Sequence, residues 1–456
     1  MRDPYRLKFH ITPPVGWMND PNGFTKYKGE YHIFYQSYPY APESGVKHWG
    51  HVVTKDFIQY TRLPAALVPD MDYDYQGCYS GSAVEKDGLL YLLYTGHVSD
   101  KSPKEEQCLA SSEDGIVFRK FAGNPVIRHP ADMEEDFRDP YVWKKDDRYY
   151  CLIGNKCEDR GRVLLYQSED LINWQYLNVM LEGTKDDGTM WECPSYVEIG
   201  EMAVLFLSPE NRRGIRHSTL YYLGRLNYET GKFQVFSEGR TDWGSEFYAP
   251  QVVNTGERKI LTAWMDNWEA ERKSEEYLWC GALCYPREVQ IKDGELHLNP
   301  IEELRQQETI ILNRKDFHLS AGENGLSQLN EVMFELELNV CHAELHSHVL
   351  KLSFREGADQ EAVVLQVTDS SVSISIVEKE KSREYQIPLP IPAQGILDIR
   401  ALVDMSSVEL FFCEGRVNAT YRFYFQEESG GFHLTSDWGI DIKELTVRRI
   451  LPVEVK

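Results

Sequence analysis

The feature that most constrains the fold is a repeat of 54 to 59 residues within the first 305 positions. Five apolar, aromatic-rich segments each follow a charged or glycine-containing turn, and they start at residues 29, 88, 147, 201 and 258. Alternation and turn residues divide each unit into about four short strands. Five such units predict a five-bladed β-propeller, with a stacked β-solenoid or a pair of sandwiches as alternatives.

From about residue 310 this repeat ends and an alternation of apolar and polar residues begins. Typical segments are VMFELELNV at 332–340 and SVELFFCEG at 407–415. About eight strands of this kind, each with one wet face, are typical of a β-sandwich. The sequence therefore predicts an all-β chain, with a propeller catalytic domain at 1–305 and a β-sandwich domain at 306–456.

Charge and composition limit the partners of the chain. The formal net charge of -23 disfavours binding to nucleic acid or to anionic membrane surfaces. A neutral small molecule such as a carbohydrate is an easier ligand. The oligomeric state is left open.

The location and the metal content are also expectations from the sequence. The first 14 residues have no apolar core of the kind found in signal peptides, so we expect a cytoplasmic protein. Nine irregularly spaced cysteines are typical of reduced thiols. Neither these cysteines nor the 13 histidines have metal-ligand spacing, and we expect no metal and no cofactor.

Three acidic residues fall at similar places in the repeat. The strand before each apolar segment can be aligned across the units, and the aligned positions are roughly Asp20, Ser80, Asp139, Glu192 and Tyr248. The first strand of each propeller blade lines the central channel, so these carboxylates should meet there. An acid next to proline is, taken alone, more often a turn residue, but the shared phase favours a common site.

Carboxylates that converge among aromatic rings are what glycoside cleavage requires. One protonated carboxyl group protonates the leaving oxygen, and one carboxylate attacks the anomeric carbon or activates water. A third can stabilise positive charge in the transition state. Trp191, the neighbour of Glu192, is expected to shield that carboxyl group from water.

Around these acids the chain resembles the family 32 glycoside hydrolases, which include invertases, sucrose-6-phosphate hydrolases, levanases and inulinases. The resemblance extends over nearly the whole chain. The matching stretches are GWMNDPNGF (16–24), HIFYQ (32–36), HWGHVVTKD (48–56), GCYSGSAV (77–84), DFRDPYVW (136–143), MWECPSYVEI (190–199), EFYAPQ (246–251), PREV (286–289) and VDMSSVELFFCEG (403–415).

The resemblance implies a five-bladed propeller followed by a sandwich, and a retaining double displacement. It makes Asp20 the nucleophile, Glu192 the general acid/base and Asp139 the stabiliser of the transition state. It also implies a set of residues around the fructose ring, namely Trp17, Asn19, Gln36, Tyr79, Ser80, Arg138 and Trp264.

The expected activity is that of a β-fructofuranosidase acting on sucrose, sucrose 6-phosphate or short fructo-oligosaccharides. Fructan exo-hydrolysis and fructosyl transfer are alternatives that use the same intermediate. An inverting furanosidase of the arabinan type and a non-catalytic sugar-binding protein are further alternatives, which the three acids and the WMNDPNG stretch disfavour.

The chain departs from the family pattern in places that bear on substrate choice. Ser44 stands where the family usually has tryptophan, Tyr79 replaces a phenylalanine and Glu246 replaces an aspartate. Five basic residues are expected near the leaving group, either as a phosphate site or as a solvated turn: Lys47, Arg212, Arg213, Arg216 and His217.

Overall fold

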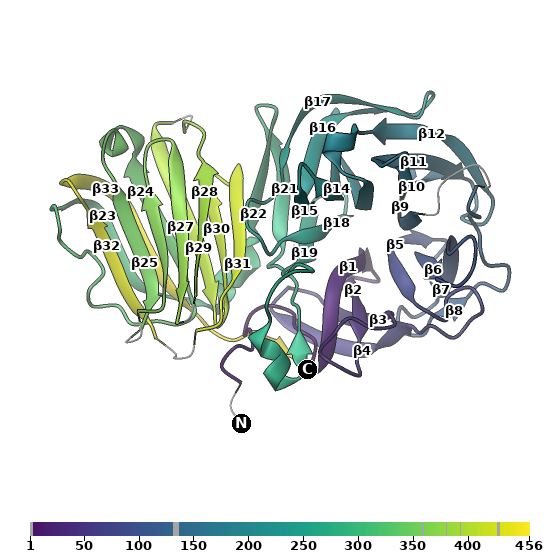
Figure 1. Cartoon of the computed structure of the whole chain (residues 1–456), viewed down its shortest axis with the longest axis horizontal. Helices are drawn as coiled ribbons and strands as arrows, with labels where there is room; N and C mark the ends of the chain where they lie inside the picture. The colour runs from purple at the N-terminus through teal and green to yellow at the C-terminus, as the bar shows by residue number, and fades with distance from the viewer. Residues whose placement is uncertain (1–2, 131–135, 358–359, 380, 393, 426–428) are drawn as a thin grey trace. The chain divides into compact units, whose positions relative to one another are not determined.

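The structure is a computed structural model that describes residues 3–130, 136–357, 360–379, 381–392, 394–425 and 429–456 (Figure 1). Strands dominate it, which confirms the all-β class. The helices of the described residues are short 3₁₀ turns, η1 (Lys185–Asp187), η2 (Lys273–Tyr277), η3 (Glu302–Gln307) and η4 (His342–Leu345). None of the described helices has the length and apolarity that crossing a membrane requires.

The chain forms two compact units, each assembled from several stretches. The larger unit consists of Ile11–Thr241, Glu246–Glu295 and Glu454–Lys456. The smaller unit consists of Met1–His10, Asp242–Ser245 and Leu296–Val453. Strand β22 (Glu295–Pro300) leads the chain from the larger unit into the smaller one.

The described part of the larger unit contains five mainly antiparallel sheets (Figure 1). The first contains, in spatial order, β20 (Trp279–Cys280), β1 (Gly16–Tyr27), β2 (Glu30–Tyr38), β3 (His48–Thr54), β4 (Gln59–Leu67) and β34 (Glu454–Val455). The second contains β5 (Cys78–Lys86), β6 (Leu89–His97), β7 (Glu105–Ser112) and β8 (Arg119–Lys120). The third contains β9 (Phe137–Lys145), β10 (Arg148–Cys157), β11 (Arg160–Ser168) and β12 (Trp174–Glu182).

The last two sheets of this unit follow the same plan. The fourth contains β13 (Met190–Ile199), β14 (Met202–Arg212), β15 (Ile215–His217), β16 (Leu220–Asn227) and β17 (Lys232–Arg240). The fifth contains β18 (Tyr248–Asn254), β19 (Lys259–Trp264), β21 (Arg287–Lys292) and β22. The first strands of the five sheets contact one another in a closed order, β1 with β5, β5 with β9, β9 with β13, β13 with β18 and β18 with β1.

Each of these five inner strands contains a β-bulge where the predicted site residues lie. One extra residue interrupts the ladder after Met18, Tyr79, Arg138, Glu192 and Tyr248. A bulge re-aims side chains, so that consecutive residues can reach the same region instead of pointing to opposite faces. At its bulge, an inner strand can therefore direct two consecutive side chains toward the centre of the unit.

The predicted alignment, which gave roughly equivalent positions, differs from the observed register by one residue in the first sheet and in the last two. Asp139, Cys193 and Ala249 have φ values of 64°, 48° and 51° and each precedes a proline, so these three residues are equivalent. Glu192 therefore occupies the position of Arg138 rather than that of Asp139. The same holds for the tyrosine that precedes Ala249. A one-residue bulge shifts the pairing register of the residues that follow it, and this shift cannot be recognised from the hydrophobic pattern of the strand.

The described part of the smaller unit is a β-sandwich of two antiparallel sheets. One contains β23 (Glu308–Leu319), β33 (Ile440–Ile450), β24 (Phe334–Cys341), β29 (Ile396–Asp404), β30 (Ser407–Phe412) and β31 (Val417–Arg422). The other contains β28 (Lys381–Pro388), β27 (Ser371–Glu378), β26 (Ala362–Val367), β25 (Leu350–Glu356) and β32 (Gly431–Ser436). Alternate residues of both sheets share one apolar core, for example Leu336 of β24 and Leu352 of β25.

Within the smaller unit, His10 links two buried carboxylates. Its Nδ1 lies 2.8 Å from Asp404 Oδ2 and its Nε2 lies 2.9 Å from Glu409 Oε1, and all three side chains are fully buried. Burial alone lowers the pKa of His10. The hydrogen bonds and negative charges of the two carboxylates outweigh burial and raise that pKa above its usual 6.5.

We predict that His10→Asn lowers the free energy of unfolding by about 3 kcal/mol at pH 5.5, because it breaks a buried ion pair. A raised histidine pKa stabilises the fold fully below pH 6.5, and this contribution is lost as the pH rises through the folded-state pKa. The difference between wild type and variant should therefore shrink toward pH 9. Urea unfolding at both pH values measures it, with His318→Asn at an exposed ion pair as the control. An equal difference at both pH values contradicts the prediction.

Candidate active site

The structure brings the three predicted acids together around Cys193. The Cys193 thiol lies 3.5 Å from Asp20 Oδ2 and 3.6 Å from Asp139 Oδ2. The backbone N–H of Cys193 donates a hydrogen bond of 3.0 Å to the same oxygen of Asp139. Glu192 directly precedes Cys193, so carboxyl groups from strands β1, β9 and β13 form one cluster.

Asp20 has one carboxylate oxygen held in place and one available. Ser80 Oγ donates a 2.6 Å hydrogen bond to Oδ2, whereas the buried Oδ1 has no partner among the described residues. Burial raises the pKa of Asp20, and the charge of Glu192 adds to this, although the hydrogen bond from Ser80 opposes it. The lone pairs of Oδ1 are therefore not engaged by a hydrogen bond from a described residue.

Glu192 is held by two donors from neighbouring strands. Arg138 donates to Glu192 Oε1 from Nε at 3.2 Å and from a terminal nitrogen at 2.9 Å. Tyr248 donates from its hydroxyl group to Oε2 at 2.6 Å. Arginine and a buried tyrosine hydroxyl group both form charge-assisted hydrogen bonds with a carboxylate, so the orientation of the Glu192 side chain is fixed.

The expectation that Trp191 shields Glu192 was wrong. The Trp191 ring packs 5.9 Å from Tyr222, and its Nε1 donates to the backbone oxygen of Asp187. A Cβ atom at Gly161 would lie 2.1 Å from this ring. The ring therefore fits only because residue 161 has no side chain. Successive strand residues point to opposite faces, and the tryptophan therefore faces away from the acid it precedes.

Asp139 is the most strongly perturbed of the three acids. Burial raises its pKa to about 8, with further contributions from the charges of Glu192 and Asp20, while Arg138 opposes the shift. Its backbone N–H donates to Thr95 Oγ1 at 3.0 Å, which fixes the bulge. At neutral pH this cluster does not hold three full negative charges.

An aromatic wall borders the cluster near Asp20. Trp17 stacks on Trp268 with ring centroids 5.7 Å apart, and both rings contact the buried Trp264. Trp17 Nε1 donates to Asn19 Oδ1 at 2.7 Å. Trp264 lies behind the other two rings, and Trp268, which the sequence patterns did not reveal, is the partly exposed one.

Lys47 lies against this wall rather than in a basic cluster. Its Nζ is 5.3 Å from the Trp17 ring centroid and 5.7 Å from that of Trp268, and it donates to Ser44 Oγ at 2.7 Å. Burial lowers the pKa of Lys47 to about 8, although the charge of Asp20 opposes this shift.

The other predicted ligand residues lie on strands β2 and β5. Gln36 is buried and donates from Nε2 to the backbone oxygen of Cys78 at 3.1 Å. Tyr79 stacks on His97 with ring centroids 4.1 Å apart and an interplanar angle of 5°. Burial raises the pKa of Tyr79 to about 12, so its hydroxyl group remains a hydrogen-bond donor at physiological pH.

A cavity of about 280 Å³ opens beside Glu192. It is lined by Glu192, Glu210, Asn211, Arg216, His217 and Trp268. Of the five basic residues expected near the leaving group, only Arg216 and His217 line it. Arg212 instead lies 4.0 Å from Glu238. The two ring nitrogens of His217 are buried and have no partner among the described residues.

Glu210 is a residue of this cavity that the sequence did not single out. Burial and the charge of Glu192 raise its pKa to about 7, while Arg138 opposes the shift. Its place was hidden because it follows the apolar core of β14 by several residues and resembles a solvated acid.

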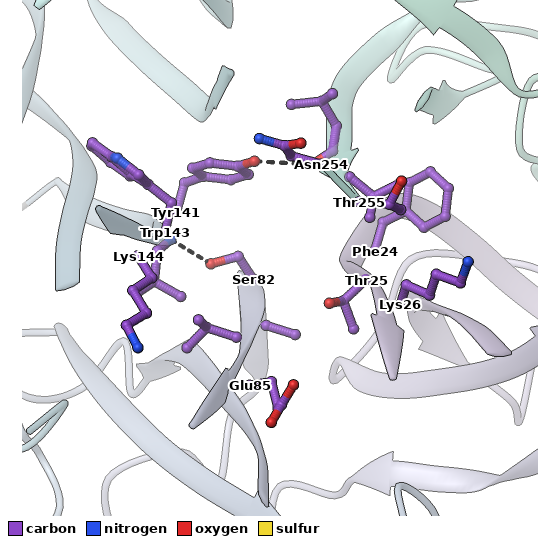
Figure 2. Close-up of a pocket in the computed structure, with 15 residues that line it drawn as sticks. Phe24, Thr25, Lys26, Ser82, Glu85, Tyr141, Trp143, Lys144, Asn254 and Thr255 are labelled. Atoms are coloured by element: carbon purple, nitrogen blue, oxygen red, sulfur yellow. Dashed lines mark hydrogen bonds between the residues drawn. The ribbon is translucent and has the colours of Figure 1, made fainter. Parts of the chain in front are cut away.

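A second cavity of about 390 Å³ lies further along the same inner strands, and Figure 2 shows it. It is lined by Phe24–Lys26, Ser82–Glu85, Tyr141–Lys144 and Val252–Thr255. The Ser82 hydroxyl group both donates and accepts a hydrogen bond here, and the Tyr141 hydroxyl group donates one. These hydrogen bonds join neighbouring strands. Its only carboxyl group, Glu85, is exposed, so this cavity lacks the paired acids that glycoside cleavage needs.

Paired buried acids beside a cavity and an aromatic wall define a glycoside hydrolase. Two family models agree with this class. The model described as glycosyl hydrolases family 32 N-terminal domain matches residues 10–300, and the one described as glycosyl hydrolases family 32 C terminal matches residues 301–449. The chain belongs to glycosyl hydrolase family 32.

Individual relatives support the assignment along most of the chain. A sucrose-6-phosphate hydrolase of Zymomonas mobilis is 34% identical over 91% of this chain and 85% of its own length. A raffinose invertase of Escherichia coli is 35% identical over 92% of this chain and 90% of its own length. A solved β-fructofuranosidase of Bombyx mori is 34% identical, with a TM-score of 0.85 over 100% of this chain and 96% of that chain.

We predict that Lys47→Met raises the free energy of unfolding at pH 7 by about 1–3 kcal/mol. A lysine whose pKa is lowered on folding destabilises the fold while it is charged, fully below pH 8 and progressively less up to 10.5. The contacts with the two tryptophans offset part of this effect. Urea unfolding at pH 7 and pH 10 measures the gain, which should fade at the higher pH. Lys55→Met, at an exposed lysine, is the control; a destabilised Lys47→Met at pH 7 contradicts the prediction.

Proposed function

We propose that the chain hydrolyses terminal β-D-fructofuranosyl residues with retention, using Asp20 as nucleophile, Glu192 as general acid/base and Asp139 as stabiliser of the transition state. The observation that supports this most is the partner-free, buried Oδ1 of Asp20 in a cluster where Glu192 borders an open cavity. An oxygen without a partner can approach the anomeric carbon, and an acid at a cavity can reach the leaving group.

In the first step Asp20 Oδ1 bonds to the anomeric carbon while Glu192 transfers its proton to the departing oxygen. The new carboxylate of Glu192 is then stabilised by Arg138 and Tyr248. In the second step Glu192 takes a proton from water, the water oxygen bonds to the anomeric carbon, and Asp20 leaves with its electron pair. Asp139, held by the N–H of Cys193, is placed to bind ring hydroxyls.

The roles predict different responses to the leaving group. Glu192→Gln should lower kcat on sucrose by about 10²–10⁴-fold, but much less on an aryl β-D-fructofuranoside, whose phenolate leaves without a proton. Asp20→Asn should lower both rates by a similar factor, because the attacking oxygen is lost. Steady-state kinetics with both substrates measures this, and Glu198→Gln on the same strand serves as the control. Equal losses on both substrates in Glu192→Gln contradict the assignment of the acid.

The same reaction run in methanol separates the remaining alternatives. A retaining enzyme forms methyl β-D-fructofuranoside, and an inverting enzyme of the arabinan type forms the α anomer or no methyl glycoside. Kestose made at high sucrose concentration would favour fructosyl transfer. NMR of the first product decides between them.

For the substrate we propose sucrose 6-phosphate. Its support is the name of the Zymomonas mobilis relative and the place of Arg216 and His217 in the cavity beside Glu192. Arg216 is exposed and pairs with Glu269 at 3.2 Å, so its guanidinium group can turn to an incoming phosphate. Unphosphorylated sucrose is the second candidate, favoured by the raffinose invertase and by the sucrose complex of the Bombyx mori enzyme.

If a phosphate is recognised, kcat/KM for sucrose 6-phosphate should exceed that for sucrose by about tenfold or more, since a charge-assisted hydrogen bond contributes roughly 1.5–3 kcal/mol. Arg216→Ala should remove much of this preference and leave kcat/KM for sucrose nearly unchanged. Arg225→Ala, another exposed arginine, is the control. Equal efficiency on both sugars would assign the chain to sucrose instead.

We also propose that the five sheets of the larger unit are the blades of a five-bladed propeller, which is supported by the closed order of their first strands. The division into domains 1–305 and 306–456 is proposed likewise, supported by the family models that meet at residues 300 and 301. A cytoplasmic location is proposed on the nine free cysteines.

A further inference from the structure

A buried carboxylate outside the acid cluster contacts the arginine that holds Glu192. Glu105 is the first residue of β7, and its side chain is 2% exposed. Its Oε2 accepts a 2.8 Å hydrogen bond from the backbone N–H of Phe137. Its Oε1 lies 3.6 Å from a terminal nitrogen of Arg138 and 3.4 Å from His97 Nδ1. It does not line the cavity beside Glu192.

Glu105 is a fixed negative charge. Burial raises the pKa of a carboxyl group, but the Arg138 charge, the contact with His97 and the hydrogen bond from the backbone N–H of Phe137 outweigh burial here and lower the pKa of Glu105. Lys104 contributes in the same direction. An ionised carboxylate away from water is costly unless it is paired, so its partner is bound firmly to it.

The guanidinium group of Arg138 is divided between two sets of carboxylates. One terminal nitrogen faces Glu105 and also lies 2.9 Å from Asp136 Oδ1. The other lies 2.9 Å from Glu192 Oε1 and 3.5 Å from Glu210 Oε1. The charge of Asp139 acts on it as well. Each carboxylate on the Glu105 side reduces the positive field that Arg138 exerts on Glu192.

We propose that Glu105 is a positioning residue that anchors Arg138 from behind and, by sharing its positive charge, lets Glu192 keep the proton that the first step of catalysis requires. This inference rests on the proposed role of Glu192 as general acid. Without Glu105, less negative charge would offset the positive charge of Arg138. Glu192 would then lose its proton at a lower pH.

A second contact connects Glu105 to the ligand side. His97, which lies beside Glu105, stacks on Tyr79, one of the residues proposed to surround the fructose ring. Glu105 thus holds an arginine directed at the acid and, through the histidine, an aromatic ring from a neighbouring strand. One buried carboxylate orients two site residues without touching the substrate.

Glu105→Gln tests the proposal, because glutamine can still accept the hydrogen bond from Phe137 but has no charge. The alkaline limb of the pH profile of kcat/KM, which reports loss of the acid's proton, should move to lower pH by about half a unit or more. Its neighbour Glu106→Gln, which removes a charge on the other face of β7, should leave the limb in place. Glu105→Asp keeps the charge and should largely restore the wild-type profile.

An alkaline limb that is unchanged or moves to higher pH in folded Glu105→Gln overturns the proposal. If that variant does not fold, Asp136→Asn replaces it, since the partly exposed Asp136 faces the same end of Arg138 and its loss should move the limb in the same direction; an unmoved limb there overturns the proposal too. A failure of the proposed function shows separately, as a Glu192→Gln variant whose loss of rate does not depend on the leaving group.

Discussion

The site depends on one buried positive charge among several negative ones. Arg138 lies within 3.6 Å of carboxylate oxygens of Glu105, Asp136, Glu192 and Glu210. An arginine cannot give up its proton in a protein, so it remains a cation even when it is 11% exposed. Without it, the acids would repel one another in a place that water hardly reaches. The acids of the cluster differ in how readily they hold a proton, and this difference arises from the guanidinium charge and from the burial around it.

The backbone makes this crowding of side chains feasible. A regular strand would turn Arg138 and Asp139 to opposite faces of the sheet, but the bulge and the positive φ of Asp139 direct both toward the same cluster. A non-glycine residue in this conformation costs of order 1–3 kcal/mol, which the surrounding sheet must supply. The hydrogen bond from Asp139 N–H to Thr95 Oγ1 is one visible part of that support. Cys193 and Ala249 have the same kind of backbone conformation at the bulges of the next two inner strands.

The sequence predicted the all-β class and the co-location of Asp20, Asp139 and Glu192. Both predictions needed only the apolar periodicity of single segments and the spacing between motifs, which can be read without knowing any tertiary contact. It did not predict the register position of Glu192 within its strand, because a bulge adds one residue without changing the amino-acid composition of the strand. It also could not identify the contacts of Glu105 with Phe137 and Arg138, which join residues more than 30 positions apart. The expectation for Trp191 failed for a related reason, because adjacency in a strand places a neighbour on the opposite face.

The loss of the family's usual tryptophan at Ser44 has a structural counterpart in Trp268. This ring stacks on Trp17 and also lines the cavity next to Glu192. Lys47, hydrogen-bonded to Ser44, lies over both rings and brings a desolvated cation to the wall. A cation is attracted to an aromatic face, and it also attracts negatively charged groups. Selectivity between leaving groups should therefore be decided around Trp268, where the changed wall and the cavity meet, rather than at the three acids.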